Sequence, residues 1–260
     1  MHEQAIASAV PETSLDPKVI AGRTVTDGAA CVRGAEIDDA DFAALLSEMG
    51  EMMVTPGETE VPGYPMLNVV TNAGRDTPPV SRWHSDTTYV ARPPIFTGLR
   101  VVEVPEEGGA TLVIDTRPLW DELSNADKGR LATVRVLHKV SGVEPPEGSE
   151  TEAMHPLVRR QPETGRVGFF QTVPERTPAA LYLDGEEASG NVRLFYERAR
   201  KLPAMKHTWR PGDLLFWDNR VTLHKGDHSA VKGVRTLHRG MVRGEVPVCV
   251  DPADFALAAE

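Results

Sequence analysis

The strongest constraint on the fold of this chain is a short motif, Trp83-His84-Ser85-Asp86, considered together with a distant histidine, His224. In an extended strand, side chains two positions apart point to the same face, so we expect the His84 imidazole and the Asp86 carboxylate to lie side by side. A fold that brings His224 opposite them would offer a metal two nitrogen ligands and one oxygen ligand on one face. The other coordination positions would stay open, which suits non-haem Fe(II) and oxygen chemistry.

A His-x-Asp pattern alone is weak evidence, because it occurs by chance in many chains. The support comes from two arginines, Arg235 and Arg239, which follow His224 by eleven and fifteen positions. Because they are four positions apart, both should face the same side of a final strand, predicted over residues 234–242. Two guanidiniums beside a metal need anionic partners, and the planar fork of arginine suits carboxylates. Five further histidines are interpreted as surface or packed core residues: His138, His155, His207, His228 and His238.

Composition argues against several classes of function. Lysine and arginine number 28 against 38 aspartates and glutamates, which gives a formal net charge of -10. Such a chain has little attraction for nucleic acids or anionic membranes, so we expect neither as a partner. The first residues lack the basic and apolar segments of a signal peptide, and Cys31 and Cys249 match neither a disulfide framework nor a zinc spacing. We therefore expect a cytoplasmic protein.

The turn residues predict a mainly β fold. The 22 glycines and 21 prolines, many in clusters, indicate numerous short strands joined by irregular loops. A length of 260 residues without a repeat or linker fits a single domain over residues 1–260. Strands that return in pairs, with a few flanking helices, fit a double-stranded β-helix, which is a cupin-like jelly-roll sandwich. Exposed sheet edges would also be compatible with a homo-oligomer.

Hydrophobic periodicity predicts the helices. One helix is expected to begin at Asp38 or Asp39 and to end at Gly50, with an apolar face that repeats at offsets of three and four. The residues of that face are Phe42, Leu45, Leu46 and Met49. Further helices are predicted over residues 118–128 and 189–201.

Apolar segments bounded by turn residues predict the strands. Three pairs are interpreted as antiparallel hairpins: residues 95–104 with 110–115, 155–160 with 166–170, and 206–209 with 214–218. Residues 1–18 are expected to form a loosely ordered arm. Residues 55–82, apart from a short strand at 66–70, and residues 141–190 are expected to form active-site loops.

Five motifs follow one another along the chain: Trp83–Asp86, Glu107–Thr111, His155–Arg159 with Pro162–Arg166, Gly212–His224, and Arg235–Arg239. In order and spacing they closely resemble the taurine and 2,4-dichlorophenoxyacetate dioxygenase family. Members of that family are Fe(II)- and 2-oxoglutarate-dependent oxygenases with a jelly-roll core. The resemblance extends from about Trp83 to Arg239.

The resemblance implies a role for each matching residue. His84, Asp86 and His224 would be the iron ligands, and they would be catalytic through the bound iron. Thr111 would donate a hydrogen bond to a carboxylate of 2-oxoglutarate. Arg235 would pair with the far carboxylate of the same cosubstrate.

The substrate pocket is less closely constrained. Arg239 matches an arginine that, in the sulfonate-oxidising branch, lies near both the cosubstrate and an acidic group of the substrate. That branch carries an asparagine four positions before the first iron ligand, where this chain has Val80. The pocket is therefore expected to differ from a taurine pocket, and Tyr89 and Asn68 are further candidates to line it.

The resemblance implies an oxidoreductase that uses Fe(II), 2-oxoglutarate and O2. Oxidative decarboxylation of 2-oxoglutarate would release succinate and carbon dioxide, coupled to hydroxylation of an unactivated C–H bond in a small polar metabolite bearing a carboxylate or sulfonate. Desaturation or cyclisation with the same cofactors is an alternative, because all three begin with removal of hydrogen from the substrate. A jelly-roll module that binds metal without catalysis is a third, less favoured interpretation.

Overall fold

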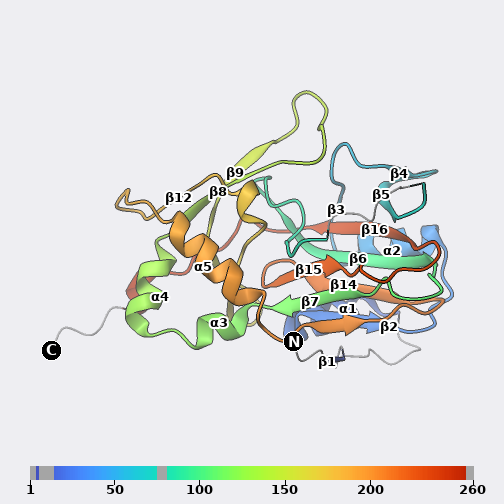
Figure 1. Ribbon diagram of the computed structural model, residues 1–260, viewed down its shortest axis with the longest axis horizontal. Coiled ribbons are helices and arrows are strands. Elements are labelled where there is room, and N and C mark those ends of the chain that lie inside the picture. The colour runs from blue at the N-terminus through green and yellow to red at the C-terminus, as the bar shows by residue number, and fades with distance from the viewer. Residues whose placement is uncertain (1–3, 6–14, 75–80, 256–260) are drawn as a thin grey trace.

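A computed structural model describes residues 4–5, 15–74 and 81–255, and strands dominate it (Figure 1). The larger sheet contains, in spatial order, β2 (Ala29–Val32), β14 (Leu214–Asp218), β6 (Pro94–Glu103), β16 (Thr236–Arg243), β5 (Tyr64–Thr71) and β4 (Glu60–Val61). Strand β3 (Met52–Met53) also pairs with β16. The smaller facing sheet contains β1 (Gln4–Ala5), β13 (Met205–His207), β7 (Thr111–Asp115) and β15 (Thr222–Gly226).

Apolar side chains from both sheets form a common core. Leu99 and Leu237 of the larger sheet cluster with Val113 of the facing sheet, and none of the three is more than 5% exposed. Strand side chains alternate between faces, so the opposite face of β16 is free to pack against a helix. The mainly β sandwich that the sequence predicts is therefore confirmed.

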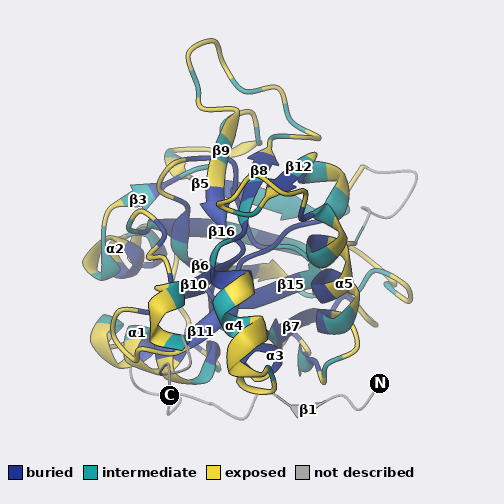
Figure 2. Ribbon diagram, turned by 90° about the vertical axis from the view of Figure 1, so that its left-hand side faces the viewer, coloured by how far each residue is buried: buried dark blue, intermediate teal, exposed yellow. Residues whose placement is uncertain are grey.

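Helix α2 (Asp39–Met49) covers the outer face of the larger sheet (Figure 2). The Asp38 side chain caps it by accepting a hydrogen bond from the amide of Asp41 at 2.9 Å, and Gly50 ends it. Phe42, Leu45 and Leu46 of its predicted apolar face are buried, and Met49 is partly buried against the same core cluster. The close approach of helix and sheet requires glycine at Gly240, where a Cβ atom would lie 2.2 Å from Leu46 Cδ1.

The other helices lie around the sandwich. They are α1 (Pro17–Asp27), α3 (Arg117–Asp121), α4 (Asn125–Ala132) and α5 (Ser189–Ala199), with short 3-10 turns η1 (Pro174–Arg176) and η2 (Pro252–Phe255). Helix α5 confirms the helix predicted over residues 189–201 and buries Val192, Phe195, Tyr196 and Ala199. The prediction of a single helix over residues 118–128 is wrong, because the chain forms α3 and α4 there. Residues 122–124 separate them, and Ser124 caps α4. Among the described residues, no helix is long and apolar enough to cross a membrane.

Two of the three predicted hairpins are wrong. Strand β6 pairs with β14 and β16, whereas β7 pairs with β13 and β15 in the other sheet. The segments before and after residues 210–213 likewise separate, because β13 joins β7 whereas β14 joins β2 and β6. In each case the connection crosses from one sheet to the other. Only glycine fits one such crossing, since a Cβ atom on Gly108, at φ 72°, would lie 2.4 Å from the Ala230 carbonyl oxygen.

The remaining strands form smaller sheets beside the sandwich. One is the hairpin of β10 (Val158–Arg160) and β11 (Val167–Phe169), which confirms the hairpin predicted from residues 155–160 and 166–170. The other is a sheet of β12 (Ala179–Leu181), β8 (Arg135–Lys139) and β9 (Glu152–Pro156).

The predicted loops are more ordered than expected. Residues 141–190 include β9 to β12, so the loop interpretation of this segment is wrong for those strands. Residues 55–82 include β4 and an eight-residue β5, which is longer than predicted because β5 pairs with both β4 and β16. Most of the predicted arm, residues 1–18, lies outside the described residues, and its last two residues begin α1.

A buried histidine gives the fold a pH dependence. His138 is fully buried, stacks on Phe170 at 5.5 Å and meets the edge of His155. Burial, reinforced by His155, lowers the pKa of His138 from 6.5 to about 3. The unfolded chain therefore binds a proton between these pH values that the folded protein excludes, so the free energy of unfolding falls as pH decreases below 6.5.

We expect His138→Phe to flatten this dependence by up to about 1.4 kcal/mol per pH unit, because the variant has one fewer histidine that must stay neutral. Urea unfolding of both proteins between pH 7 and pH 5 measures the difference. Parallel stability curves for the two proteins would contradict the assignment.

Candidate metal centre

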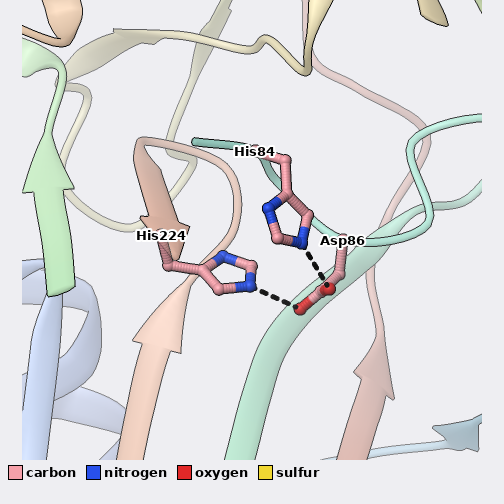
Figure 3. A group of neighbouring side chains, drawn as sticks. All are labelled: His84, Asp86 and His224. Atoms are coloured by element: carbon pink, nitrogen blue, oxygen red, sulfur yellow. Dashed lines mark ion pairs between the residues drawn. The ribbon is translucent and has the colours of Figure 1, made fainter. Parts of the chain in front are cut away.

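The structure brings His84, Asp86 and His224 together (Figure 3). Their potential ligand atoms all lie within 4.8 Å of one another. Nε2 of His84 is 3.7 Å from Oδ1 of Asp86, and Nε2 of His224 is 3.6 Å from Oδ2. Both imidazoles thus face one carboxylate, and a single divalent ion between the three fits this donor set.

The backbone, rather than strand alternation, sets this geometry. His84 donates its amide to the His224 carbonyl at 3.1 Å, and His224 returns the bond at 2.9 Å, so the two histidines form an isolated antiparallel bridge. After His84 the chain leaves the extended conformation. Asp86 begins a turn in which Thr87 has a φ of 42°. The expected extended His-x-Asp segment is therefore wrong, although both side chains reach the same site.

A hydrogen-bonded chain holds the Asp86 carboxylate. The Thr97 hydroxyl on β6 donates to Asp86 Oδ2 at 2.7 Å, and Asn219 donates to that hydroxyl at 2.8 Å. The Asn219 side-chain oxygen accepts from the Asp86 amide at 3.2 Å and from the Trp217 indole at 3.1 Å. Trp217 and Asn219 thus support the position of Asp86. Thr97 was missed, because a lone strand threonine carries no distinguishing sequence signal.

Electrostatics favour the protonation states that bind a metal. Burial opposes the charge on Asp86, but His224, Arg239, His84 and the Thr97 hydrogen bond outweigh it and lower the Asp86 pKa to about 2. Burial lowers the pKa of His224 to about 3 despite the nearby carboxylate. At neutral pH the site therefore presents an anionic carboxylate and a neutral His224, as metal ligands require.

A cavity of about 150 Å³ extends from His84 and His224 to Thr111 and Arg235. Arg235 is 3% exposed and donates from Nε to the Gly109 carbonyl at 2.7 Å and from Nη2 to Thr111 Oγ1 at 3.1 Å. Burial lowers its pKa to about 10. Within the described ranges no carboxylate pairs with this guanidinium, so the cavity offers a buried cation to an anionic ligand.

The other predicted arginine differs, because it has acidic partners. Arg239 lies 3.6 Å from Asp86 Oδ1 and forms a close ion pair with Glu58, a residue that the sequence interpretation missed. Nη2 of Arg239 also donates to Asn68 Oδ1 at 3.4 Å. Arg239 and Glu58 line a second cavity of about 360 Å³, which shares Arg235 and Arg239 with the first.

Two further substrate candidates have different outcomes. Tyr89 is 7% exposed, and burial, followed by the charge of Glu58, raises the pKa of its hydroxyl. No hydrogen-bond partner for that hydroxyl occurs in the described part of the chain. Val80 lies outside the described residues.

Comparison with known proteins gives a family match over residues 12–241, to the family described as "Taurine catabolism dioxygenase TauD, TfdA family". Pentalenolactone F synthase of Streptomyces arenae is 29% identical over 196 residues, which are 66% of this chain and 62% of that protein. An alpha-ketoglutarate-dependent sulfonate dioxygenase of Saccharomyces cerevisiae is 30% identical over 155 residues, covering 55% of this chain and 37% of that protein.

A crystal structure of a taurine dioxygenase from Burkholderia xenovorans has a TM-score of 0.77 and 24% identity, covering 96% of this chain and 93% of that chain. This likeness concerns the fold, and it confirms the predicted jelly-roll. The chain spans less than two thirds of the length of the two curated relatives, 62% and 37%.

We expect Thr97→Val to weaken divalent metal binding about tenfold, because the hydrogen bond that orients Asp86 is lost. Calorimetric titration with Co(II) measures this. The matched control is Thr24→Val, which removes a buried hydroxyl elsewhere, on α1. This variant should bind Co(II) as the wild type does. Equal affinities for both variants would refute a role for Thr97.

Proposed function

The chain belongs to the taurine catabolism dioxygenase TauD, TfdA family, and on this basis we propose that it is an Fe(II)- and 2-oxoglutarate-dependent dioxygenase. One observation carries the proposal. The His84, Asp86 and His224 donors adjoin a cavity whose other end contains Arg235, a buried cation without an acidic partner among the described residues. A dicarboxylate that chelates the metal at one end and meets Arg235 at the other suits both features.

When bound, Fe(II) supplies the chemistry that couples O2 to oxidative decarboxylation of 2-oxoglutarate, giving succinate and carbon dioxide. In this proposal the protein orients the reactants. His84, Asp86 and His224 would hold the ion, and the keto acid would bind beside them. Arg235 and Thr111 bind the far carboxylate and so determine how the cosubstrate lies in the cavity.

For the substrate, we propose a small polar metabolite with a carboxylate or sulfonate, hydroxylated at an unactivated C–H bond. Arg239 supports this, because its guanidinium lies between Asp86 and the second cavity. The yeast relative is named a sulfonate dioxygenase, which is consistent with an anionic substrate. Glu58 should weaken the binding of such a substrate, because an anion that approaches Arg239 also meets the Glu58 carboxylate.

The first test is anaerobic absorption spectroscopy of the protein with Fe(II) and 2-oxoglutarate. The wild type should develop a visible metal-to-ligand charge-transfer band, and His84→Ala should not. Arg235→Gln should raise the dissociation constant for 2-oxoglutarate at least about tenfold, because a charged hydrogen bond to a buried carboxylate is lost.

Arg100→Gln is the matched control for that test. Arg100 lies on β6, whereas Arg235 directly precedes β16, and Arg100 pairs with Asp39, so its loss should leave 2-oxoglutarate binding unchanged. A folded wild-type protein that binds iron without producing the band would reject the proposal and favour a metal-binding module without catalysis.

A second prediction concerns Glu58. Glu58→Gln should tighten binding of alkanesulfonates and aryloxyacetates about tenfold, because a negative charge beside Arg239 is removed. The shift of the charge-transfer band on titration measures the affinity. Glu60→Gln, which neutralises an exposed glutamate on β4, should have no effect, and weaker binding in Glu58→Gln would exclude Glu58 as an opposing charge.

A further inference from the structure

Trp209 is a buried residue beside the cavity that no part of the proposed reaction uses. It is 4% exposed and packs with Val113 and Leu215 in the core between the sheets. The His207 ring meets it edge-on at 4.4 Å. These contacts fix the direction of the indole N–H, which donates to Thr111 Oγ1 at 3.2 Å.

The Thr111 hydroxyl accepts a second hydrogen bond, from Arg235 Nη2 at 3.1 Å. A hydroxyl oxygen has two lone pairs and one hydrogen. With both lone pairs engaged by donors, the hydrogen must take the remaining direction. The described residues provide no acceptor for it, and Thr111 lines the cavity beside the metal centre.

We propose that Trp209 is a positioning residue for the cosubstrate. By donating to Thr111, it turns the threonine hydroxyl into a committed donor aimed at an incoming carboxylate. Arg235 and Thr111 then present adjacent donors to the same carboxylate before it arrives. This inference rests on the proposed function, because 2-oxoglutarate is the carboxylate in question.

A packing role for Trp209 is the competing explanation. Its ring centroid lies 5.9 Å from the Arg235 guanidinium carbon, so the indole also contacts Arg235 as a cation–π partner. Phenylalanine keeps an aromatic ring at this position but removes the N–H. The two roles can therefore be distinguished by comparing the effect of Trp209→Phe in proteins that have a hydroxyl at position 111 with its effect in a protein that lacks one.

The experiment is a double-mutant cycle on the dissociation constant of 2-oxoglutarate, followed anaerobically by the charge-transfer band with Fe(II). Trp209→Phe should raise the constant about fivefold, as expected for loss of one oriented hydrogen bond. Thr111→Val should raise it at least as much. In the Thr111→Val background, Trp209→Phe should have no further effect, whereas in the Thr111→Ser background its effect should persist.

An equal effect of Trp209→Phe in both backgrounds would overturn the inference, as would no effect in either. Absence of the band in the wild-type protein would instead reject the proposed function. If Trp209→Phe does not fold, the indole proton of Trp209 in the wild type, assigned by NMR with Zn(II) in place of iron, provides the test. It should shift downfield on addition of 2-oxoglutarate, and the Trp120 indole proton should not. An unmoved Trp209 proton would also overturn the inference.

Discussion

The buried negative charge of Asp86 is the interaction on which the site depends. A carboxylate that is 3% exposed is costly unless neighbouring charges and donors compensate it. Thr97 donates to it directly, Asn219 bonds both to Thr97 and to the Asp86 backbone, and Arg239 and two imidazoles supply positive or polar surroundings. These groups come from β6, β15, β16, the segment after β14 and the isolated bridge at His84, so the sandwich must be complete before the charge is stabilised.

The two arginines divide the electrostatic tasks of the cavity. The charge of Arg239 is balanced by its ion pair with Glu58, whereas Arg235 is buried without an acidic partner among the described residues. A divalent ion and Arg235 together bring three positive charges against the single negative charge of Asp86. A dianionic ligand would neutralise the remainder, which is the physical reason that the cavity suits a dicarboxylate. The negative charge of Glu58 would repel a second anion.

Local patterns predicted the parts of the fold whose causes are local. Helix α2 follows from its Asp38 cap, its apolar repeat and Gly50, and the β10–β11 hairpin follows from its turn residues. The hairpins assigned to β6 with β7 and to β13 with β14 failed. Their turns resemble those of hairpins, but the partner of each strand is chosen by burial between two sheets. That choice depends on residues far away in the chain.

The sequence by itself determined which residues could form the site: two histidines and an aspartate of the right types, and two arginines at an even spacing. Only the tertiary structure decided that His84 and His224 bridge through their backbones and that Thr97 and Asn219 hold Asp86. It also decided that Arg239 forms an ion pair with Glu58. The physical reason is the distance along the chain over which each property is set. Ligand chemistry belongs to individual side chains, whereas distances, burial and charge balance arise only when distant segments share one core.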